Sequence, residues 1–156
     1  MKMTYSLALI LVTIFTSLSS HAKEYKYYHL CGDNRSSDKI TFTVVILAEP
    51  SFASVRSPDG TYIRYELEQG GSGQMSSQGG GGYSALVKGG GSFTMASLFG
   101  GGRVMMKLNL PGKETYYGGE CFTNLDSHNP PPDWMERAYT TWLETEEASM
   151  NETAAP

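Results

Sequence analysis

The sequence predicts an all-β domain: an antiparallel, barrel-like fold of about eight strands with one disulfide and a C-terminal helical extension. Between Lys23 and Cys121, short apolar, β-branched or aromatic runs alternate with clusters of Gly, Pro, Asp and Ser, as is typical of antiparallel sheets. The two cysteines, Cys31 and Cys121, lie near the ends of that region, and a helical apolar pattern follows Pro132. Together these three observations define the expected fold class.

Residues 1–22 have the three parts of a secretory signal peptide. Lys2 supplies the positive start, residues 7–15 form an apolar core, and residues 20–22 (Ser-His-Ala) form a small-x-small cleavage site. The apolar core is shorter than the roughly 20 residues that a membrane-spanning helix needs, and no cysteine follows it to carry a lipid. We therefore expect a secreted protein without a membrane anchor, located in the periplasm, that begins at Lys23.

The remaining length suits one domain. We expect residues 23–125 to form the barrel-like domain and residues 126–156 to form a Pro-rich spacer, an amphipathic helix and a disordered acidic tail. The full chain has a formal net charge of −4, and residues 122–156 contain seven acidic residues against one basic residue. This charge argues against a nucleic-acid partner. The acidic tail is either a solvated helix face or a surface that attracts a basic partner.

The two cysteines are expected to form a single disulfide, because thiols oxidise in exported proteins. A bridge between Cys31 and Cys121 encloses nearly the whole β-region, and closing a loop of that size stabilises a fold by roughly 3 to 5 kcal/mol. The chain has no CxxC, HxH or HxxxH spacing, so we expect no metal site and no cofactor. His29 is interpreted as a structural residue of the first strand.

The expected strands follow the apolar runs, and two of them show the pattern most clearly. The second alternates threonine with larger apolar residues before becoming continuously apolar, and the first is rich in aromatic residues. Eight strands of this length fit a closed barrel or a sandwich, and closure would remove exposed edges. The expected strands are Tyr25 to Cys31, Lys39 to Leu47, Ser54 to Ser57, Thr61 to Glu68, Tyr83 to Lys88, Ser92 to Leu98, Arg103 to Leu110 and Glu114 to Cys121.

The third and fourth strands are expected to form a hairpin around residues 58–60 (Pro-Asp-Gly), because proline presets one turn dihedral and glycine accepts a positive φ. Alternation along the second arm separates an inner from an outer face. The residues expected to face the core are Ile63, Tyr65 and Leu67. The residues expected to face water are Tyr62, Arg64, Glu66 and Glu68.

Glycine is concentrated in the middle of the chain, where sixteen of the 18 glycines lie between Gly70 and Gly119. Several form runs, at residues 79–82, 89–91 and 100–102, that fall between expected strands. Neither of the glycine-rich phosphate-binding patterns, GxxxxGK[ST] or GxGxxG, is present. The runs are therefore predicted to be hairpin loops.

A helix is expected from Asp133 to Glu147, after the stiff spacer at residues 129–132. Asp133 and Glu136 resemble a capping box. The apolar residues at three- and four-residue spacing make one stripe: Trp134, Met135, Ala138, Tyr139, Trp142 and Leu143. Two alternatives remain for this stripe. It packs on the β-domain, or Trp134, Tyr139 and Trp142 bind in a groove of a partner. Residues 148–156 are expected to be disordered.

Residues that could carry catalysis are few. His29 and His128, the histidines beyond the signal peptide, have no ligand partner at a metal-binding spacing, and no GxSxG element is present. Glu66 and Glu68 share a strand face and could form a carboxylate pair for glycoside hydrolysis. Alternating exposed glutamates are common on half-buried strands, so we expect a protein that binds and does not catalyse.

Four motifs follow one another along the chain. They are residues 28–31 (Tyr-His-Leu-Cys), Ser72-Gly73, Tyr83 with Lys88-Gly89, and Cys121. In this order they resemble the Tyr-x-Cys start, Ser-Gly element, Tyr and Lys-Gly element and closing cysteine of the periplasmic and membrane-bound inhibitors of C-type lysozyme. The first motif here has one extra residue. The segment of greatest similarity is LEQGGSGQMSSQGGGGYSALVKGGGSFTM, from Leu67 to Met95.

The resemblance implies an eight-stranded antiparallel barrel that inhibits C-type lysozyme. It implies that Ser72 and Lys88, with Tyr83 nearby, enter the lysozyme cleft and engage its catalytic carboxylates. Residues 74–76 (Gln-Met-Ser) depart from the family, which usually has a basic residue and a tyrosine there, and Leu86 replaces an aromatic residue. The C-terminal helix exceeds the usual inhibitor length. A second hypothesis is therefore a structural or interaction protein of the cell envelope that binds a partner through that helix.

Overall fold

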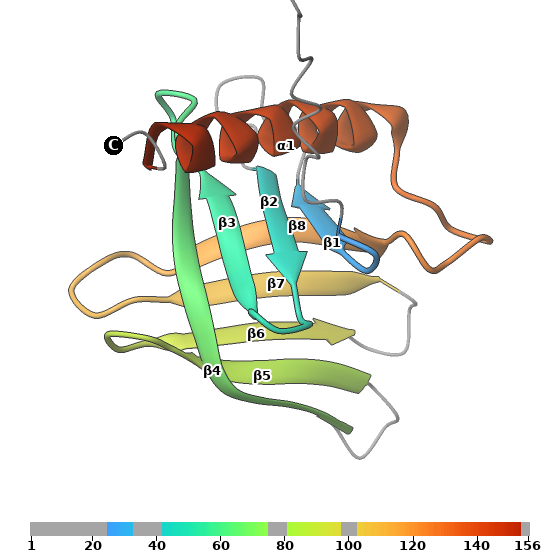
Figure 1. Cartoon of the computed structure of the whole chain (residues 1–156). Coiled ribbons are helices and arrows are strands. Elements are labelled where there is room, and N and C mark those ends of the chain that lie inside the picture. Colours follow the sequence, from blue (N-terminus) through green and yellow to red (C-terminus); the bar gives the residue numbers. More distant parts are fainter. Residues whose placement is uncertain (1–24, 33–41, 75–80, 98–102, 154–156) are drawn as a thin grey trace, which may run out of the picture.

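The computed structural model describes residues 25–32, 42–74, 81–97 and 103–153 (Figure 1). The predicted signal peptide, parts of the glycine runs and residues 154–156 lie outside these ranges. No helix in the described part of the chain is long and apolar enough to cross a membrane. The elements are β1 (His29–Gly32), β2 (Phe42–Ile46), β3 (Phe52–Arg56), β4 (Tyr62–Gln74), β5 (Gly81–Val87), β6 (Ser92–Ser97), β7 (Val104–Asn109), β8 (Tyr116–Thr123) and α1 (Asp133–Thr153).

The eight strands form a closed antiparallel barrel, as the sequence predicts. Each strand pairs with its neighbours in chain order, and β1 also pairs with β8. β4 pairs with β3 through its first residues and with β5 from Leu67 onward, with a shift in register between Glu68 and Gly71. Because β4 serves both neighbours, it reaches Gln74, beyond the predicted end at Glu68.

The predicted disulfide is present and joins the strands that close the barrel. Cys31 and Cys121 are direct partners in the register of β1 with β8, and their Cα atoms are 4.0 Å apart. The bridge links positions 90 residues apart in the sequence, so nearly the whole barrel lies within the covalent loop. The sequence-based expectation of a long enclosing loop is confirmed.

The barrel interior holds one apolar cluster, to which every strand contributes. Its buried members are Cys31, Val45, Ala53, Val55, Leu67, Ala85, Val87, Phe93, Met95, Met106, Leu108 and Cys121. Alternate residues of each strand point inward, so the cluster follows the period of two that strands impose. Tyr65 packs against this cluster and Leu67 belongs to it, as predicted.

Ile63 departs from the prediction because 44% of its surface is exposed. It lies near the beginning of β4, next to the Pro58-Asp59-Gly60 turn, where the barrel ends. Tyr62 also differs from the prediction, in which its side chain faces water. It packs against a second apolar cluster on the outside of the barrel. Both differences arise because tertiary packing, which periodicity does not report, decides which strand face is covered.

The second cluster lies between α1 and the outer face of β1, β2 and β3. Its buried members are Leu30, Phe42, Val44, Ile46, Phe52, Met135, Tyr139 and Trp142. In Figure 1, α1 lies across the strands of this part of the barrel. All five residues of β2 are buried, because one face lines the interior and the other is covered by α1. This explains why the sequence of β2 becomes continuously apolar.

Helix α1 begins at Asp133, as predicted, but it continues to Thr153. The expectation of disorder from residue 148 is therefore wrong for residues 148–153. A helix that is already anchored gains one hydrogen bond for each further residue that it fixes, and Ala, Met and Glu are favourable helix formers. The Ser149 hydroxyl also donates to the Glu146 carbonyl at 2.8 Å.

Candidate functional site

Ser72 and Tyr83 are brought together by the pairing of β4 with β5. They are direct partners in the register, so their side chains share one face of the sheet. The Tyr83 ring packs inward, with its centroid 6.3 Å from that of Phe93. It also covers the backbone of Gly70, where an added Cβ atom would lie 1.8 Å from the Tyr83 hydroxyl oxygen. A glycine at position 70 thus leaves room for the Tyr83 ring.

Lys88 lies immediately after the other end of β5 and is paired with Glu66. Its backbone N–H donates to the Glu66 carbonyl at 3.0 Å, and its Nζ lies 2.6 Å from Glu66 Oε2. The side chains are 63% and 51% exposed. The hydrogen bond from Lys88, together with its charge, lowers the pKa of Glu66, and the same interactions raise the pKa of Lys88. Because the pair is exposed, its contribution to stability is small.

The structure separates Lys88 from Ser72. Ser72 lies beside Tyr83, and five residues of strand rise, roughly 16 Å, separate Tyr83 from Lys88. An odd number of steps along a strand also changes the face, so Tyr83 points inward while Lys88 follows the outward face of Leu86. The side chains of Ser72 and Lys88 therefore do not form one contact surface, in contrast to what the resemblance implies.

The turn after Lys88 is built from three glycines with positive φ: Gly89 (+88°), Gly90 (+112°) and Gly91 (+108°). L-residues rarely adopt this conformation. An added Cβ atom at Gly91 would also lie 2.3 Å from the Asn109 carbonyl oxygen. This run is a hairpin turn, as predicted. The prediction was wrong for Gly81 and Gly82, which are the first residues of β5.

The barrel also contains a cavity of about 320 Å³ at the end where Ser72 lies. Polar side chains of His29, Ser72 and Thr123 line it together with apolar groups. Burial lowers the pKa of His29, which favours a neutral imidazole. The full set of described lining residues is His29, Leu47, Ser72, Gly81, Gly82, Tyr83, Met95, Val104, Cys121, Phe122 and Thr123.

Sequence reasoning did not place His29 at a cavity, although a signal was present. His29 lies two residues before Cys31, so the two side chains share the inward face of β1. A disulfide that closes a barrel therefore also indicates that His29 points inward. What periodicity could not give is the free volume next to the imidazole.

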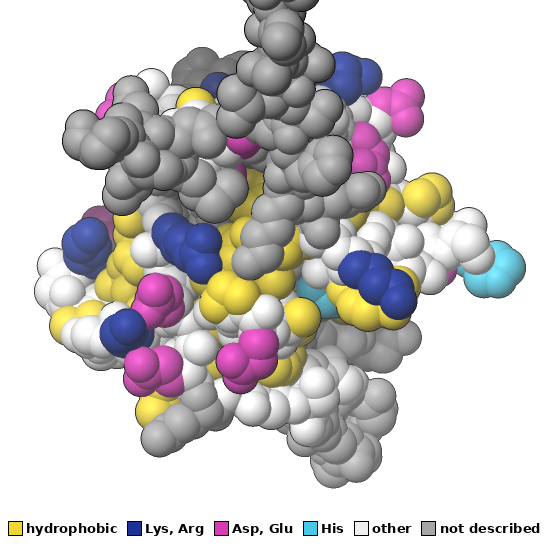
Figure 2. Space-filling model, in the orientation of Figure 1, with side chains coloured by type: hydrophobic (Ala, Val, Ile, Leu, Met, Phe, Trp, Pro, Cys, Tyr) yellow, Lys and Arg dark blue, Asp and Glu magenta, His cyan; other side chains and the backbone are white. Residues whose placement is uncertain are grey.

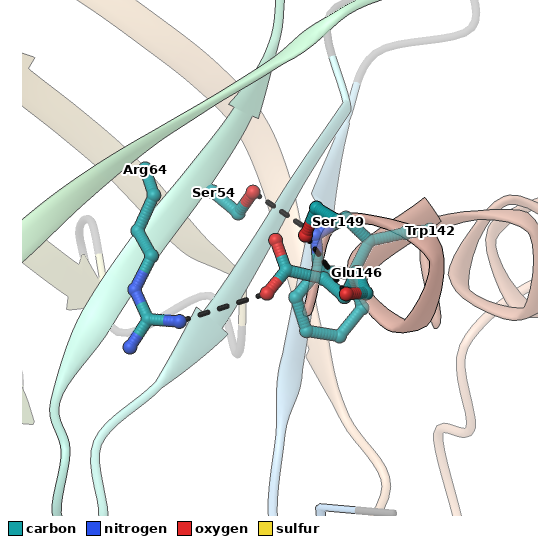
Figure 3. A network of polar contacts seen from close by, with 5 residues as sticks. All are labelled: Ser54, Arg64, Trp142, Glu146 and Ser149. Carbon is teal, nitrogen blue, oxygen red and sulfur yellow. Dashed lines mark hydrogen bonds and ion pairs between the residues drawn. The ribbon is translucent and has the colours of Figure 1, made fainter. Parts of the chain in front are cut away.

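The apolar stripe of α1 is packed on the barrel. Trp142 is 0% exposed, and its Nε1–H donates to the buried hydroxyl of Ser54 at 3.0 Å (Figure 3). Tyr139 stacks on Tyr28 with a centroid separation of 4.0 Å, and Trp134 meets Phe42 edge-on at 6.2 Å. The predicted partner-binding residues thus serve the interface between helix and barrel.

An ion pair lies beside the Trp142 contact and links β4 to α1. Arg64 Nη1 is 3.6 Å from Glu146 Oε2 (Figure 3). The guanidinium carbon of Arg64 lies 3.7 Å from the centroid of the Phe52 ring, within reach of a cation–π interaction. A hydrogen bond, an ion pair and a ring contact therefore fix this part of the helix on the strands.

Among the described residues, no group of three or more His, Cys, Asp or Glu side chains could hold a metal ion. On the face of the molecule drawn in Figure 2, basic and acidic side chains are intermingled. Comparisons with family models, with curated proteins and with solved structures found no match.

Proposed function

We propose that the protein is an exported binding protein that inhibits C-type lysozyme by inserting one end of its barrel into the active-site cleft. The observation that carries the proposal is the closed eight-stranded barrel with Cys31 bridged to Cys121 across its seam. This is the architecture that the motif resemblance implies. The disulfide supports an oxidising compartment and hence export to the periplasm.

We assign the contact to the barrel end that carries Lys88. The Lys88 side chain, which is 63% exposed, lies at the start of the glycine turn. The two carboxylates of a lysozyme cleft can replace the single carboxylate of Glu66 as the partner of the Lys88 ammonium group. Exclusion of water from the cleft strengthens such charge-assisted hydrogen bonds. Ser72, at the other end of β5, is outside this contact. The inhibitor itself performs no chemistry.

The experiment is a titration of C-type lysozyme activity with the mature protein and its variants. We expect stoichiometric inhibition by the native protein and a loss of at least about tenfold in affinity for Lys88→Ala. Glu66→Gln should tighten inhibition because it removes the competing carboxylate. Ser72→Ala should inhibit normally, as should Arg103→Ala, the control for loss of an exposed cation that is paired with one glutamate at the opposite end of the barrel.

Circular dichroism and urea denaturation establish that each variant folds like the native protein. Absence of inhibition by the native protein at micromolar concentration would refute the function. Equal losses in Lys88→Ala and Ser72→Ala would refute the assignment to a single barrel end. The alternative function, an envelope interaction through the helix, requires an exposed stripe, whereas Trp142 and Met135 are buried.

A further inference from the structure

We infer that the cavity at the Ser72 end of the barrel binds a small, uncharged, mostly apolar ring compound that carries one hydrogen-bonding group. This site is separate from the Lys88 turn, so the inference does not depend on lysozyme inhibition. It rests on the volume of the cavity, on the polar groups that converge on it, and on two wall residues that are fixed in place.

The cavity is large enough for a small molecule. Its volume of about 320 Å³ lies near the lower end of the range of small-molecule sites, roughly 300 to 1,000 Å³. Its apolar side chains include Leu47, which directly follows β2, Met95 of β6 and Val104 of β7. The cavity is partly open to solvent, and an apolar ring that enters it would lose contact with water where it meets these side chains, which favours binding.

Three polar side chains converge on the cavity from three strands: His29 from β1, Ser72 from β4 and Thr123 from β8. Thr123 Oγ1 accepts a hydrogen bond from the Leu125 N–H at 3.3 Å, which leaves its own proton to be donated. The side chains of His29 and Ser72 make no hydrogen bond to another residue in the described part of the chain. These groups can therefore serve a hydroxyl or carbonyl group of a ligand.

The charge of the lining determines the class of ligand. None of the described lining residues is Asp, Glu, Lys or Arg, and desolvation lowers the pKa of His29, so its imidazole is mainly neutral at pH 7. A charged ligand would lose its hydration without gaining an ionic partner, which is costly. The cavity thus selects against ions of either sign.

Two parts of the cavity wall are held in place before a ligand binds. Cys121 is fixed by the disulfide, and the Tyr83 ring is confined between Phe93 and the backbone of Gly70. A preorganised site binds without the cost of ordering its side chains, so that more of the contact energy contributes to affinity.

The test is a titration of the ¹⁵N-labelled mature protein, observed by two-dimensional NMR, with two probes that share a ring system. The probes are 1-naphthol, which is neutral, and 1-naphthoate, which is anionic at pH 7. We expect saturable shifts with 1-naphthol at amides of β1, β5 and β8 around the cavity, and at least tenfold weaker binding of 1-naphthoate.

Two matched variants test the location. Val104→Phe places a ring in the cavity and should weaken 1-naphthol binding at least tenfold. Leu86→Phe adds the same ring on the outer face of β5, where Leu86 is exposed, and should leave the affinity unchanged. The inference is overturned if 1-naphthol gives no saturable shift up to millimolar concentration, if both probes bind equally, or if native affinity persists in a folded Val104→Phe variant.

Discussion

The hydrogen bond between Trp142 and Ser54 gives a quantitative test of how the helix is attached. Both side chains are fully buried, and the Nε1 to Oγ distance is 3.0 Å. Ser54→Ala removes the acceptor and leaves a buried indole N–H without a partner. Such a group costs about 1 to 3 kcal/mol, because water cannot reach it in the folded state. We expect the free energy of unfolding to fall by that amount.

Trp142→Phe removes the donor and part of the ring. Its cost should remain below the about 3 to 5 kcal/mol typical of truncating a buried Trp to Ala, since most of the apolar contact is kept. In the Trp142→Phe background, Ser54→Ala should be nearly neutral because no donor remains. The two substitutions should therefore be non-additive by about 1 kcal/mol or more.

The assay is urea denaturation followed by far-ultraviolet circular dichroism, with the disulfide intact. Equal slopes of free energy against urea show that the variants unfold like the native protein. Additivity within about 0.5 kcal/mol would refute the reasoning, because independent sites add to that precision. Non-additivity would show that the Trp142 side chain is engaged with the barrel in solution, which removes it from any partner interface.

Three other measurements test separate parts of the structure. Reducing the disulfide, which links residues 90 apart, should lower the free energy of unfolding by about 3 to 5 kcal/mol, and equal urea midpoints with and without reductant would contradict this. Gly70→Ala should displace Tyr83 and destabilise the fold by about 1 kcal/mol or more, whereas Gly71→Ala should have little effect because nothing lies within 4 Å of the added Cβ atom. Near-ultraviolet circular dichroism and urea midpoints check this prediction. Equal destabilisation by the two substitutions would refute it. Burial lowers the pKa of His29 in the folded state, so the unfolded chain binds the proton more tightly. The contribution of neutral His29 to stability is therefore complete above pH 6.5, and it is lost as the pH decreases through 6.5 toward the folded-state pKa. His29→Gln should flatten the dependence of the urea midpoint between pH 5 and 7, and an unchanged slope would show that another group is responsible.

The strands and the disulfide could be predicted because their causes are local or chemical. β-Branched runs between turn residues mark each strand, and the two cysteines of a chain that is expected to be exported can pair only with each other. The sequence shows that β2 is continuously apolar, but it does not show what covers the outer face of this strand. Only the position of α1 shows that Phe42, Val44 and Ile46 are covered from outside the barrel.

The end of α1 was predicted less well, because sequence patterns report where an apolar stripe stops and not where a helix does. The stripe ends at Leu143, and Asp133–Thr153 continues for more than two turns beyond it. The predicted helix ended at Glu147, so the Arg64–Glu146 ion pair lies near its predicted end, and residues 148–153 extend beyond it. Contacts between a helix end and a distant strand depend on the tertiary arrangement, which the periodicity of either element does not contain.

The relation between Ser72 and Lys88 shows why order along the sequence could not define the candidate site. A strand pairing that placed Lys88 opposite Ser72 would shift β5 by five residues from its observed pairing of Tyr83 with Ser72. An odd shift reverses the two faces of a strand. It would turn Ala85 and Val87, which are 6% and 4% exposed inside the barrel, toward water and place Leu86 inside. Burial of these two residues therefore fixes the register and keeps Ser72 at the cavity and Lys88 at the turn. For this reason a contact pair inferred from motif order cannot be transferred here as a pair, and the two ends of β5 have to be tested separately.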